Sequence, residues 1–241
     1  MTKRINAWSS PRNISTAFMY SFAQRQDTTV VDEPLYAHYL VKTETEAQHP
    51  GTEEIIASQS TDAQTLIDEV IFGNYTTDIV LFKQMTHHLI HIDRSFLANT
   101  ENILLIRNPR AIIKSYTKVI PNPLISDIGI KMQYDLYNQL LELGTFRAIL
   151  DATQLLMNPP LVLKKLCDVF SIRFDENMLS WEVGPKPEDG VWAKYWYANV
   201  HKSNGFQPYQ HKDIELPKEL EPLAKECQPY YDFLFEKAIK V

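Results

Sequence analysis

The sequence predicts an α/β fold in three layers, with helices covering both faces of a mostly parallel central sheet. Five short apolar runs, each bounded by polar residues, have the character of buried strands, and they lie near 4–8, 28–31, 79–82, 103–106 and 147–150. Segments with helical spacing separate these runs, and such alternation is typical of a parallel sheet. The 241 residues contain no Gly/Ser-rich linker and no internal repeat. We therefore expect a single domain over residues 1–241.

A polar loop, Ser9–Thr16, follows the first strand and leads into a helix. The helix is predicted from apolar residues at helical spacing, namely Ile14, Ala17, Phe18 and Phe22. Backbone N–H groups at the helix start, the hydroxyls of Ser15 and Thr16 and the guanidinium of Arg12 could all face one anion. The two glycines and the lysine of the Walker A pattern are absent, which argues against an ordinary ATP or GTP loop.

A second construction of this kind follows the fourth strand. Arg107 ends that strand, Asn108 is a favourable N-cap, and Pro109 suits the first helical position. Ser115 then falls in the second helical turn, seven positions after Asn108 and on the same face. An arginine, a helix N-terminus and a hydroxyl thus converge on one side of the sheet, which suits a phosphate group.

Three further helices are predicted downstream, over 63–71 with Gly73 as C-cap, over 132–143 ended by Gly144, and over 161–170. Ligands of parallel sheets bind at the carboxyl ends of the strands. Glu33, Lys83 and both phosphate-binding segments are expected at that edge.

Together, the two phosphate-binding segments resemble those of the sulfotransferase family in order and in distance apart. In that family a first loop of the type Pro-Lys/Arg-Ser-Gly-Ser/Thr-Thr holds the 5′-phosphosulfate of the donor. An arginine followed eight positions later by a serine holds the 3′-phosphate, and Arg107 and Ser115 have this spacing. The resemblance continues through the strand, "DLL", proline and helix pattern of 149–170, and it is weakest between about 40 and 75. It implies a sulfotransferase-type fold, which is similar to that of P-loop NTPases.

The resemblance also implies a donor, 3′-phosphoadenosine 5′-phosphosulfate (PAPS), with 3′,5′-adenosine bisphosphate (PAP) as its product, and no metal. In the first loop the implied donor-binding residues are Ser10, Pro11, Arg12, Asn13, Ile14, Ser15 and Thr16. Arg107 and Ser115 would bind the 3′-phosphate. The family's Arg-Lys-Gly motif has its nearest counterpart in the segment with Lys202, Ser203 and Gly205, which could close over the nucleotide. The preceding aromatic cluster, 192–197, either covers a ligand or packs as ordinary core.

Sulfuryl transfer needs cations at the sulfuryl group and a base for the acceptor. Arg12 and Lys83 are the candidate cations. Glu33 is the first candidate base, because some bacterial members carry a similar Glu-Pro and because burial can raise the pKa of a carboxyl group toward neutrality. His87 and His88 are the rivals, since histidine titrates near neutral pH. If they lie on a helix, at most one of them points into the site.

The net charge and the apolar pattern of the sequence limit the kinds of partner that we expect. The formal charge of −6 argues against broad nucleic-acid binding. The chain shows no signal peptide and no apolar run of membrane-spanning length, so we expect a cytoplasmic protein whose partner is a small-molecule acceptor. Segments 34–75 and 117–130 are expected to shape the acceptor pocket.

Two other functions stay open. A kinase-like phosphotransferase would use Mg²⁺ and ATP, but the missing P-loop lysine argues against it. A catalytically silent nucleotide-binding domain is suggested by two departures from the family pattern. Ile14 stands where many members carry glycine, and His87 and His88 come two and three residues later than the family's catalytic histidine.

Overall fold

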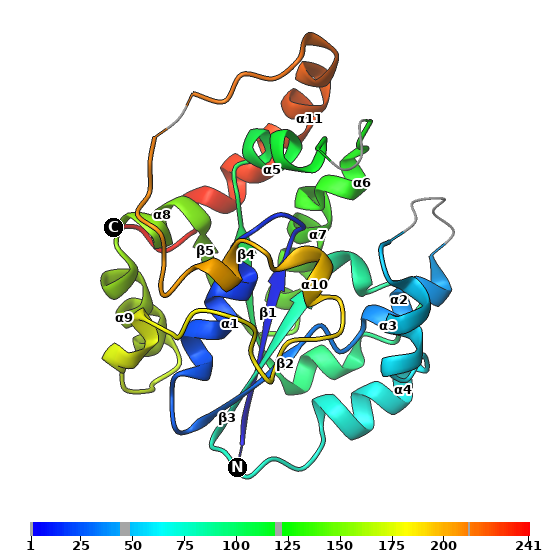
Figure 1. The fold of residues 1–241 in the computed structure, drawn as a ribbon, viewed down its shortest axis with the longest axis vertical. Coiled ribbons are helices and arrows are strands. Elements are labelled where there is room, and N and C mark those ends of the chain that lie inside the picture. Colours follow the sequence, from blue (N-terminus) through cyan, green and yellow to red (C-terminus); the bar gives the residue numbers. More distant parts are fainter. Residues whose placement is uncertain (1, 44–48, 119–121, 212) are drawn as a thin grey trace.

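The computed structural model describes residues 2–43, 49–118, 122–211 and 213–241. Within these ranges lies a five-stranded sheet of β1 (Lys3–Ser9), β2 (Thr28–Asp32), β3 (Ile79–Met85), β4 (Glu101–Ile106) and β5 (Phe146–Asp151). The strand order is β2-β3-β1-β4-β5, and all four neighbouring pairs are parallel. The predicted α/β fold with a parallel sheet is confirmed, and each predicted strand lies inside an observed one (Figure 1).

The helices alternate with the strands along the chain. In chain order the α-helices are α1 (Ser15–Ala23), α2 (Tyr36–Lys42), α3 (Thr52–Ser58), α4 (Ala63–Leu66), α5 (Pro109–Tyr116), α6 (Ile125–Ile128), α7 (Ile130–Glu142), α8 (Ala152–Met157), α9 (Pro159–Val169), α10 (Ala193–Trp196) and α11 (Glu221–Glu236). Short 3₁₀ segments lie at Thr86–His88, Ser95–Asn99, Glu176–Leu179, Val200–Lys202 and Lys218–Leu220. None of the helices within the described ranges is both long and apolar enough to cross a membrane.

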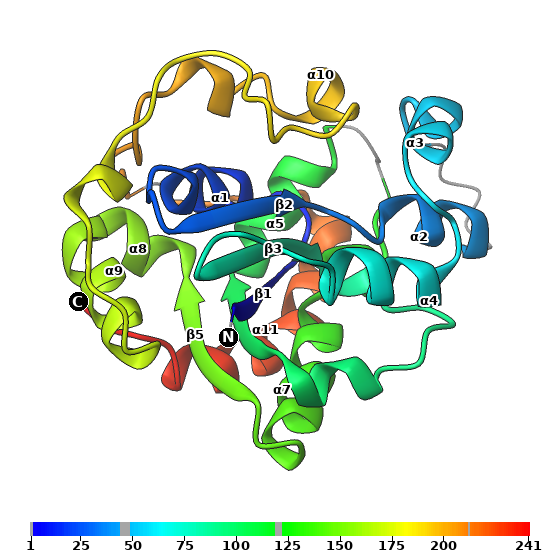
Figure 2. The ribbon, with the colours of Figure 1, turned by 90° about the horizontal axis from the view of Figure 1, so that it is seen from below.

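Alternating side chains of the strands build two cores, one on each face of the sheet. In β1, Ile5 and Ala7 belong to the core that α1, α8 and α9 cover, whereas Trp8 belongs to the core on the α7 and α11 side. This alternation is the period of two that a pleated strand imposes. Figure 2 shows the resulting layers, with α1 on one side of the sheet and α7 and α11 on the other.

The predicted helix boundaries hold in most places. Asn108 caps α5 by accepting a hydrogen bond from the backbone N–H of Arg110 at 2.9 Å, and Gly144 ends α7 in a left-handed conformation with φ of 70°. The prediction over 63–71 needs correction. There α4 passes into a π-helix at Ile67–Ile71, and Gly73 does not adopt the left-handed conformation of a C-cap.

A buried polar cluster joins β1 to β4, the two strands that lead into the segments predicted to bind phosphate. The side-chain oxygen of Asn102 accepts hydrogen bonds from Asn6 Nδ2 at 3.2 Å and from Trp8 Nε1 at 2.9 Å. Its amide nitrogen donates to the carbonyls of Leu97 and Thr100 at 3.2 and 3.1 Å. Because a buried polar group without a partner is costly, this cluster favours a single register of β1 against β4.

We therefore expect Asn102→Ala to lower the free energy of unfolding by about 3 kcal/mol, because the buried Trp8 indole N–H loses its acceptor, Asn6 loses one of its two acceptors, and a small cavity forms. Urea denaturation followed by circular dichroism measures the change. Arg147→Ala is the matched control, since the exposed Arg147–Glu101 pair at 3.1 Å is worth less than about 1 kcal/mol. Equal effects of the two changes would contradict a structural role for the cluster.

Candidate functional site

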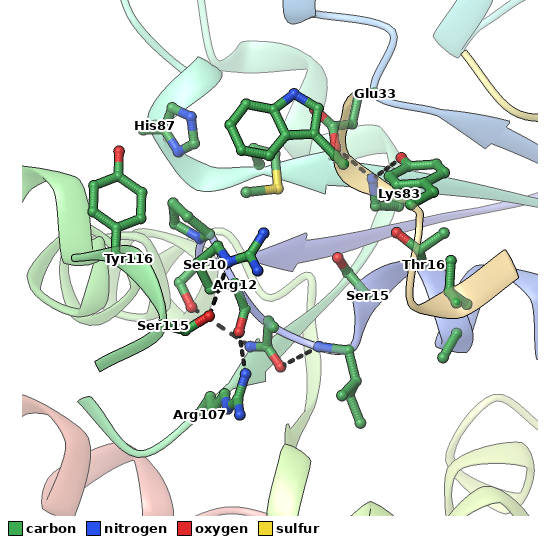
Figure 3. Close-up of a pocket in the computed structure, with 18 of the residues that line it drawn as sticks. Ser10, Arg12, Ser15, Thr16, Glu33, Lys83, His87, Arg107, Ser115 and Tyr116 are labelled. Atoms are coloured by element: carbon green, nitrogen blue, oxygen red, sulfur yellow. Dashed lines mark hydrogen bonds and ion pairs between the residues drawn. The ribbon is translucent and has the colours of Figure 1, made fainter. Parts of the chain in front are cut away.

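A cavity of about 610 Å³ opens at the carboxyl edge of the sheet. Its walls come from the segments that follow β1, β2, β3 and β4 and from the chain between α9 and α11 (Figure 3). Segments 34–75 and 117–130 also contribute, through residues such as Tyr36, His49 and Asp127. Residues 44–48 and 119–121 of those segments lie outside the described ranges.

Arg12 and Arg107 both line one end of this cavity. Arg12 Nε donates to the hydroxyl of Ser115 at 3.0 Å, and Arg107 donates to the backbone carbonyl of Arg12. Burial lowers the pKa of Arg107, and the nearby charge of Arg12 lowers it further. Among the described residues neither arginine forms an ion pair with a carboxylate. The two positive charges and one hydroxyl therefore form a site suited to an anion.

The loop before α1 completes this end of the cavity. Arg12 has a left-handed backbone with φ of 56°, an uncommon conformation for a residue other than glycine. Asn13 holds the loop in place by donating to the carbonyl of Leu105 at 2.8 Å and accepting from the N–H of Ile14 at 2.8 Å. No side chain within the described ranges caps the N-terminus of α1, so its first-turn N–H groups remain suited to an anion.

Ile14 does not require the freedom of glycine. Its φ is −95°, in a region that any residue adopts, and its side chain packs against the core on the α1 side. Ser10, Pro11, Ser15 and Thr16 line the same cavity. In Figure 3, Ser15 and Thr16 lie to the right of Arg12 and Arg107 and below Lys83. The structure thus brings together all seven loop residues singled out from the sequence.

At the other end of the cavity, Lys83 is buried between two carboxylates. Its ammonium donates to Asp32 Oδ1 at 2.9 Å, to Glu33 and to the hydroxyl of Tyr197 at 2.7 Å. Burial disfavours the charge of Lys83, but the two carboxylates outweigh burial and raise its pKa. Glu33 lines the cavity with a left-handed φ of 39°, and such strained conformations cluster at functional sites.

The proton affinity of Glu33 differs from that of an ordinary glutamate. Burial raises the pKa of Glu33, the Lys83 ammonium opposes this effect, and the Asp32 carboxylate adds to it. The second oxygen of Glu33, Oε2, lies 4.0 Å from His88 Nε2. A carboxylate with a raised pKa at a cavity wall has a higher affinity for a proton than an ordinary glutamate, as a general base requires.

His87 and His88 also line the cavity, but they lie on a 3₁₀ segment and not on a longer helix. This segment ends at His88, so His91, whose φ of 48° is left-handed, does not lie on one helix with His87. His88 is stacked between Tyr36 and Tyr39, with ring centroids 4.9 and 4.8 Å apart. Burial lowers the pKa of His88 well below its usual range. Although His87 is partly exposed, desolvation lowers its pKa to about 3. Both rings are neutral and weakly basic at pH 7.

The segment after α10 contributes unevenly to the site. Ser203 and Gly205 line the cavity, whereas Lys202 is exposed and is not among the lining residues. The Ser203 hydroxyl donates to the carbonyl of Val200 at 2.7 Å. A Cβ at Gly205 would lie 2.8 Å from the carbonyl oxygen of Leu179, so close backbone packing explains this glycine.

Sequence reasoning missed Asp32 and underrated the aromatic cluster. Asp32 is paired in register with Lys83 on the neighbouring strand, and Tyr197 reaches the same ammonium from 114 residues further along the chain. The position of Asp32 directly before Glu33 was the signal in the sequence that could have identified it as a site residue. The strand order that pairs it with Lys83 could not be read from the sequence.

Comparisons with known proteins agree with this architecture. Residues 3–238 match the model of the sulfotransferase domain family. The chain is 36% identical over 231 residues to the "branched-chain-amino-acid aminotransferase-like protein 2" of Arabidopsis thaliana, and the match covers 95% of this chain but 41% of that protein. The chain therefore spans about two fifths of the length of this curated relative.

Two solved structures share the fold. The sulfotransferase domain from the curacin biosynthetic pathway is similar with a TM-score of 0.54 at 17% identity, over 99% of both chains. A sulfotransferase from Alicyclobacillus acidocaldarius is similar with a TM-score of 0.57 at 8% identity, over 99% of this chain and 98% of that one. At these identities the likeness shows the fold. With the family model matched over almost its whole length, the chain belongs to the sulfotransferase domain family.

Proposed function

We propose that this chain transfers a sulfuryl group from PAPS to a hydroxyl or amine of a small acceptor. The observation that carries the proposal is that one cavity holds an anion site at one end and a buried Lys83–Glu33 pair at the other. The aminotransferase-like name of the Arabidopsis relative describes a protein of which the larger part lies outside the match. That name therefore does not define a reaction for this chain.

The anion site fits the phosphates of such a donor. Arg12 and Arg107 both line the cavity without a carboxylate partner among the described residues, and the hydroxyl of Ser115 lies within hydrogen-bond distance of Arg12. Arg107 and Ser115 would hold a 3′-phosphate, while Arg12, Ser15, Thr16 and the N-terminus of α1 would hold the 5′ side. When bound, PAPS supplies an activated sulfuryl group.

The other end of the cavity supplies the chemistry that the acceptor needs. Glu33 would accept the proton that the acceptor hydroxyl or amine loses, since its burial raises its affinity for that proton. The ammonium of Lys83 and the guanidinium of Arg12 would stabilise negative charge that develops during transfer. His87 and His88 are less suited to be the base, because desolvation holds both imidazoles neutral with little affinity for a proton.

Binding measurements distinguish this proposal from the two alternatives. By isothermal titration calorimetry, the protein should bind PAP far more tightly than AMP and should not require Mg²⁺. Mg²⁺-dependent binding of ATP would favour a kinase-like phosphotransferase. Tight binding of PAP without turnover over a broad panel of hydroxyl and amine acceptors would favour a silent nucleotide-binding domain.

Arg107→Ala should weaken PAP binding about tenfold to a hundredfold, because a charge-assisted contact to the 3′-phosphate is worth about 1.5–3 kcal/mol. AMP binding should stay unchanged, and Ser115→Ala should show the same selectivity with a smaller loss. Lys114→Ala, at an exposed position of the same helix, is the control. Calorimetry with both nucleotides measures the effect, and equal losses for PAP and AMP would show that Arg107 has a structural role.

Glu33→Gln should lower the transfer rate by roughly 10²–10⁴-fold while PAP affinity holds, because the amide keeps the shape but cannot accept a proton. In the wild-type protein the rate should fall as the pH drops below the raised pKa of Glu33, since the protonated carboxyl cannot act as a base. Steady-state rates from pH 5 to 9 test both statements. A large loss in His87→Gln or His88→Gln, with Glu33→Gln near wild type, would assign the base to a histidine.

A further inference from the structure

The contacts of the two carboxylates beside Lys83 differ in a way that divides their roles. Asp32 accepts hydrogen bonds from Lys83 at 2.9 Å, from the Tyr197 hydroxyl at 2.7 Å and from the backbone N–H of Gly190 at 3.2 Å. Glu33 accepts from Lys83, and its second oxygen is 4.0 Å from His88. Asp32 is therefore held by three donors, one on β3 and two on the chain between α9 and α11, whereas Glu33 lines the cavity and Asp32 is not among the lining residues.

The hydroxyl of Tyr197 bridges Lys83 and Asp32. It accepts from Lys83 at 2.7 Å and from Trp192 Nε1 at 3.1 Å, and it donates its one hydrogen to Asp32. Burial and the nearby carboxylates raise the pKa of Tyr197 well above its usual range, so the phenol keeps that hydrogen. The phenol is therefore a fixed bridge between the ammonium and the carboxylate of Asp32.

The segment that carries Tyr197 is itself anchored beside the site. Between residues 181 and 206 it passes over α1 (Figure 2). Asp189 in this segment accepts from Tyr20 of α1 at 2.5 Å and lies 2.9 Å from His201 Nε2. The same segment supplies Trp196, Ser203 and Gly205 to the cavity wall. Its position and that of Lys83 are thus coupled through one hydroxyl.

We infer that Asp32 and Tyr197 are positioning residues, which hold the Lys83 ammonium beside Glu33 so that Glu33, and not Asp32, exchanges the proton of the acceptor. This inference rests on the proposed function for the identity of the base. The interaction of these groups with Glu33 does not depend on the proposed function. The carboxylate of Asp32 lies next to Glu33, and Tyr197 holds the Lys83 ammonium between the two carboxylates. Removing either group changes Glu33 without touching the donor site.

The sign of the expected pH effect follows from the groups around Glu33. Those that face it from the neighbouring elements are Asp32 on β2, Lys83 on β3, His88 on the 3₁₀ segment after β3, Tyr36 on α2 and Tyr197 after α10. The imidazole and the two phenols are neutral at pH 7. The charge of Asp32 favours protonation of Glu33, and Lys83 opposes it. Asp32→Asn removes the first effect and leaves Lys83 to Glu33 alone, so both changes favour ionised Glu33.

Asp32→Asn should therefore move the titration midpoint of Glu33 to lower pH by roughly one pH unit or more. Carbon-13 NMR of glutamate-labelled protein, with Glu33→Gln used to assign the signal, measures this midpoint without any turnover. The acid limb of the rate–pH profile should move in the same direction. An unchanged midpoint in a folded Asp32→Asn protein would overturn the inference. A shifted midpoint together with a wild-type protein that transfers no sulfuryl group to any acceptor would support the coupling of Asp32 to Glu33 and reject the proposed function.

Tyr197→Phe tests the second residue, because it removes the hydroxyl and keeps the ring. We expect the transfer rate to fall at least about tenfold, with PAP affinity within twofold of wild type and with the Glu33 midpoint changed. Tyr195→Phe, on the same segment but exposed, is the matched control and should leave the rate unchanged. A Tyr197→Phe protein that keeps both the wild-type rate and the wild-type midpoint would overturn its assigned role.

Discussion

Strand β1 forms parallel pairs with β3 on one side and β4 on the other, and the position of the side chains around the cavity follows from this pairing. Parallel strands all end at the same edge of a sheet, so the loop after β1, the end of β3 and the helix after β4 meet there. Asn102 contributes to this arrangement by binding Asn6 and Trp8 of β1 from within β4. A change in that register would separate Arg12 from Arg107 and would leave buried polar groups unpaired.

The two ends of the cavity differ in how their charged side chains are balanced. At one end Arg12 and Arg107 bring like charges near one another, an unfavourable arrangement that a bound anion would relieve. At the other end the Lys83 ammonium is balanced by Asp32 and Glu33, because an isolated buried charge would be far more costly. Burial is the main cause of the raised pKa of Glu33; the Lys83 ammonium opposes it, and the Asp32 carboxylate adds to it.

The chain between α9 and α11 joins these two ends. Tyr197 binds Lys83 and Asp32, while Ser203 and Gly205, a few residues further on, line the same cavity. The aromatic rings of this segment and of α2 exclude water from the Lys83 cluster, and a low local dielectric strengthens every charge interaction there. Tyr197 of this aromatic cluster therefore both packs in a buried core and binds the charged groups of the site.

The sequence by itself determined the five strands, the helix caps at Asn108 and Gly144, and the two strand–loop–helix segments predicted to bind phosphate, because these depend on local apolar periodicity and local backbone preferences. It could also place Glu33 and Lys83 at one edge, since parallel strands share their carboxyl ends. The tertiary structure decided what local pattern cannot express. It paired Asp32 with Lys83 through the order of the strands, brought Tyr197 to the same ammonium, left Lys202 exposed, and placed His87 and His88 on a short 3₁₀ segment among aromatic rings. These contacts join residues distant in the chain, and their energies depend on burial, which exists only once the chain has folded.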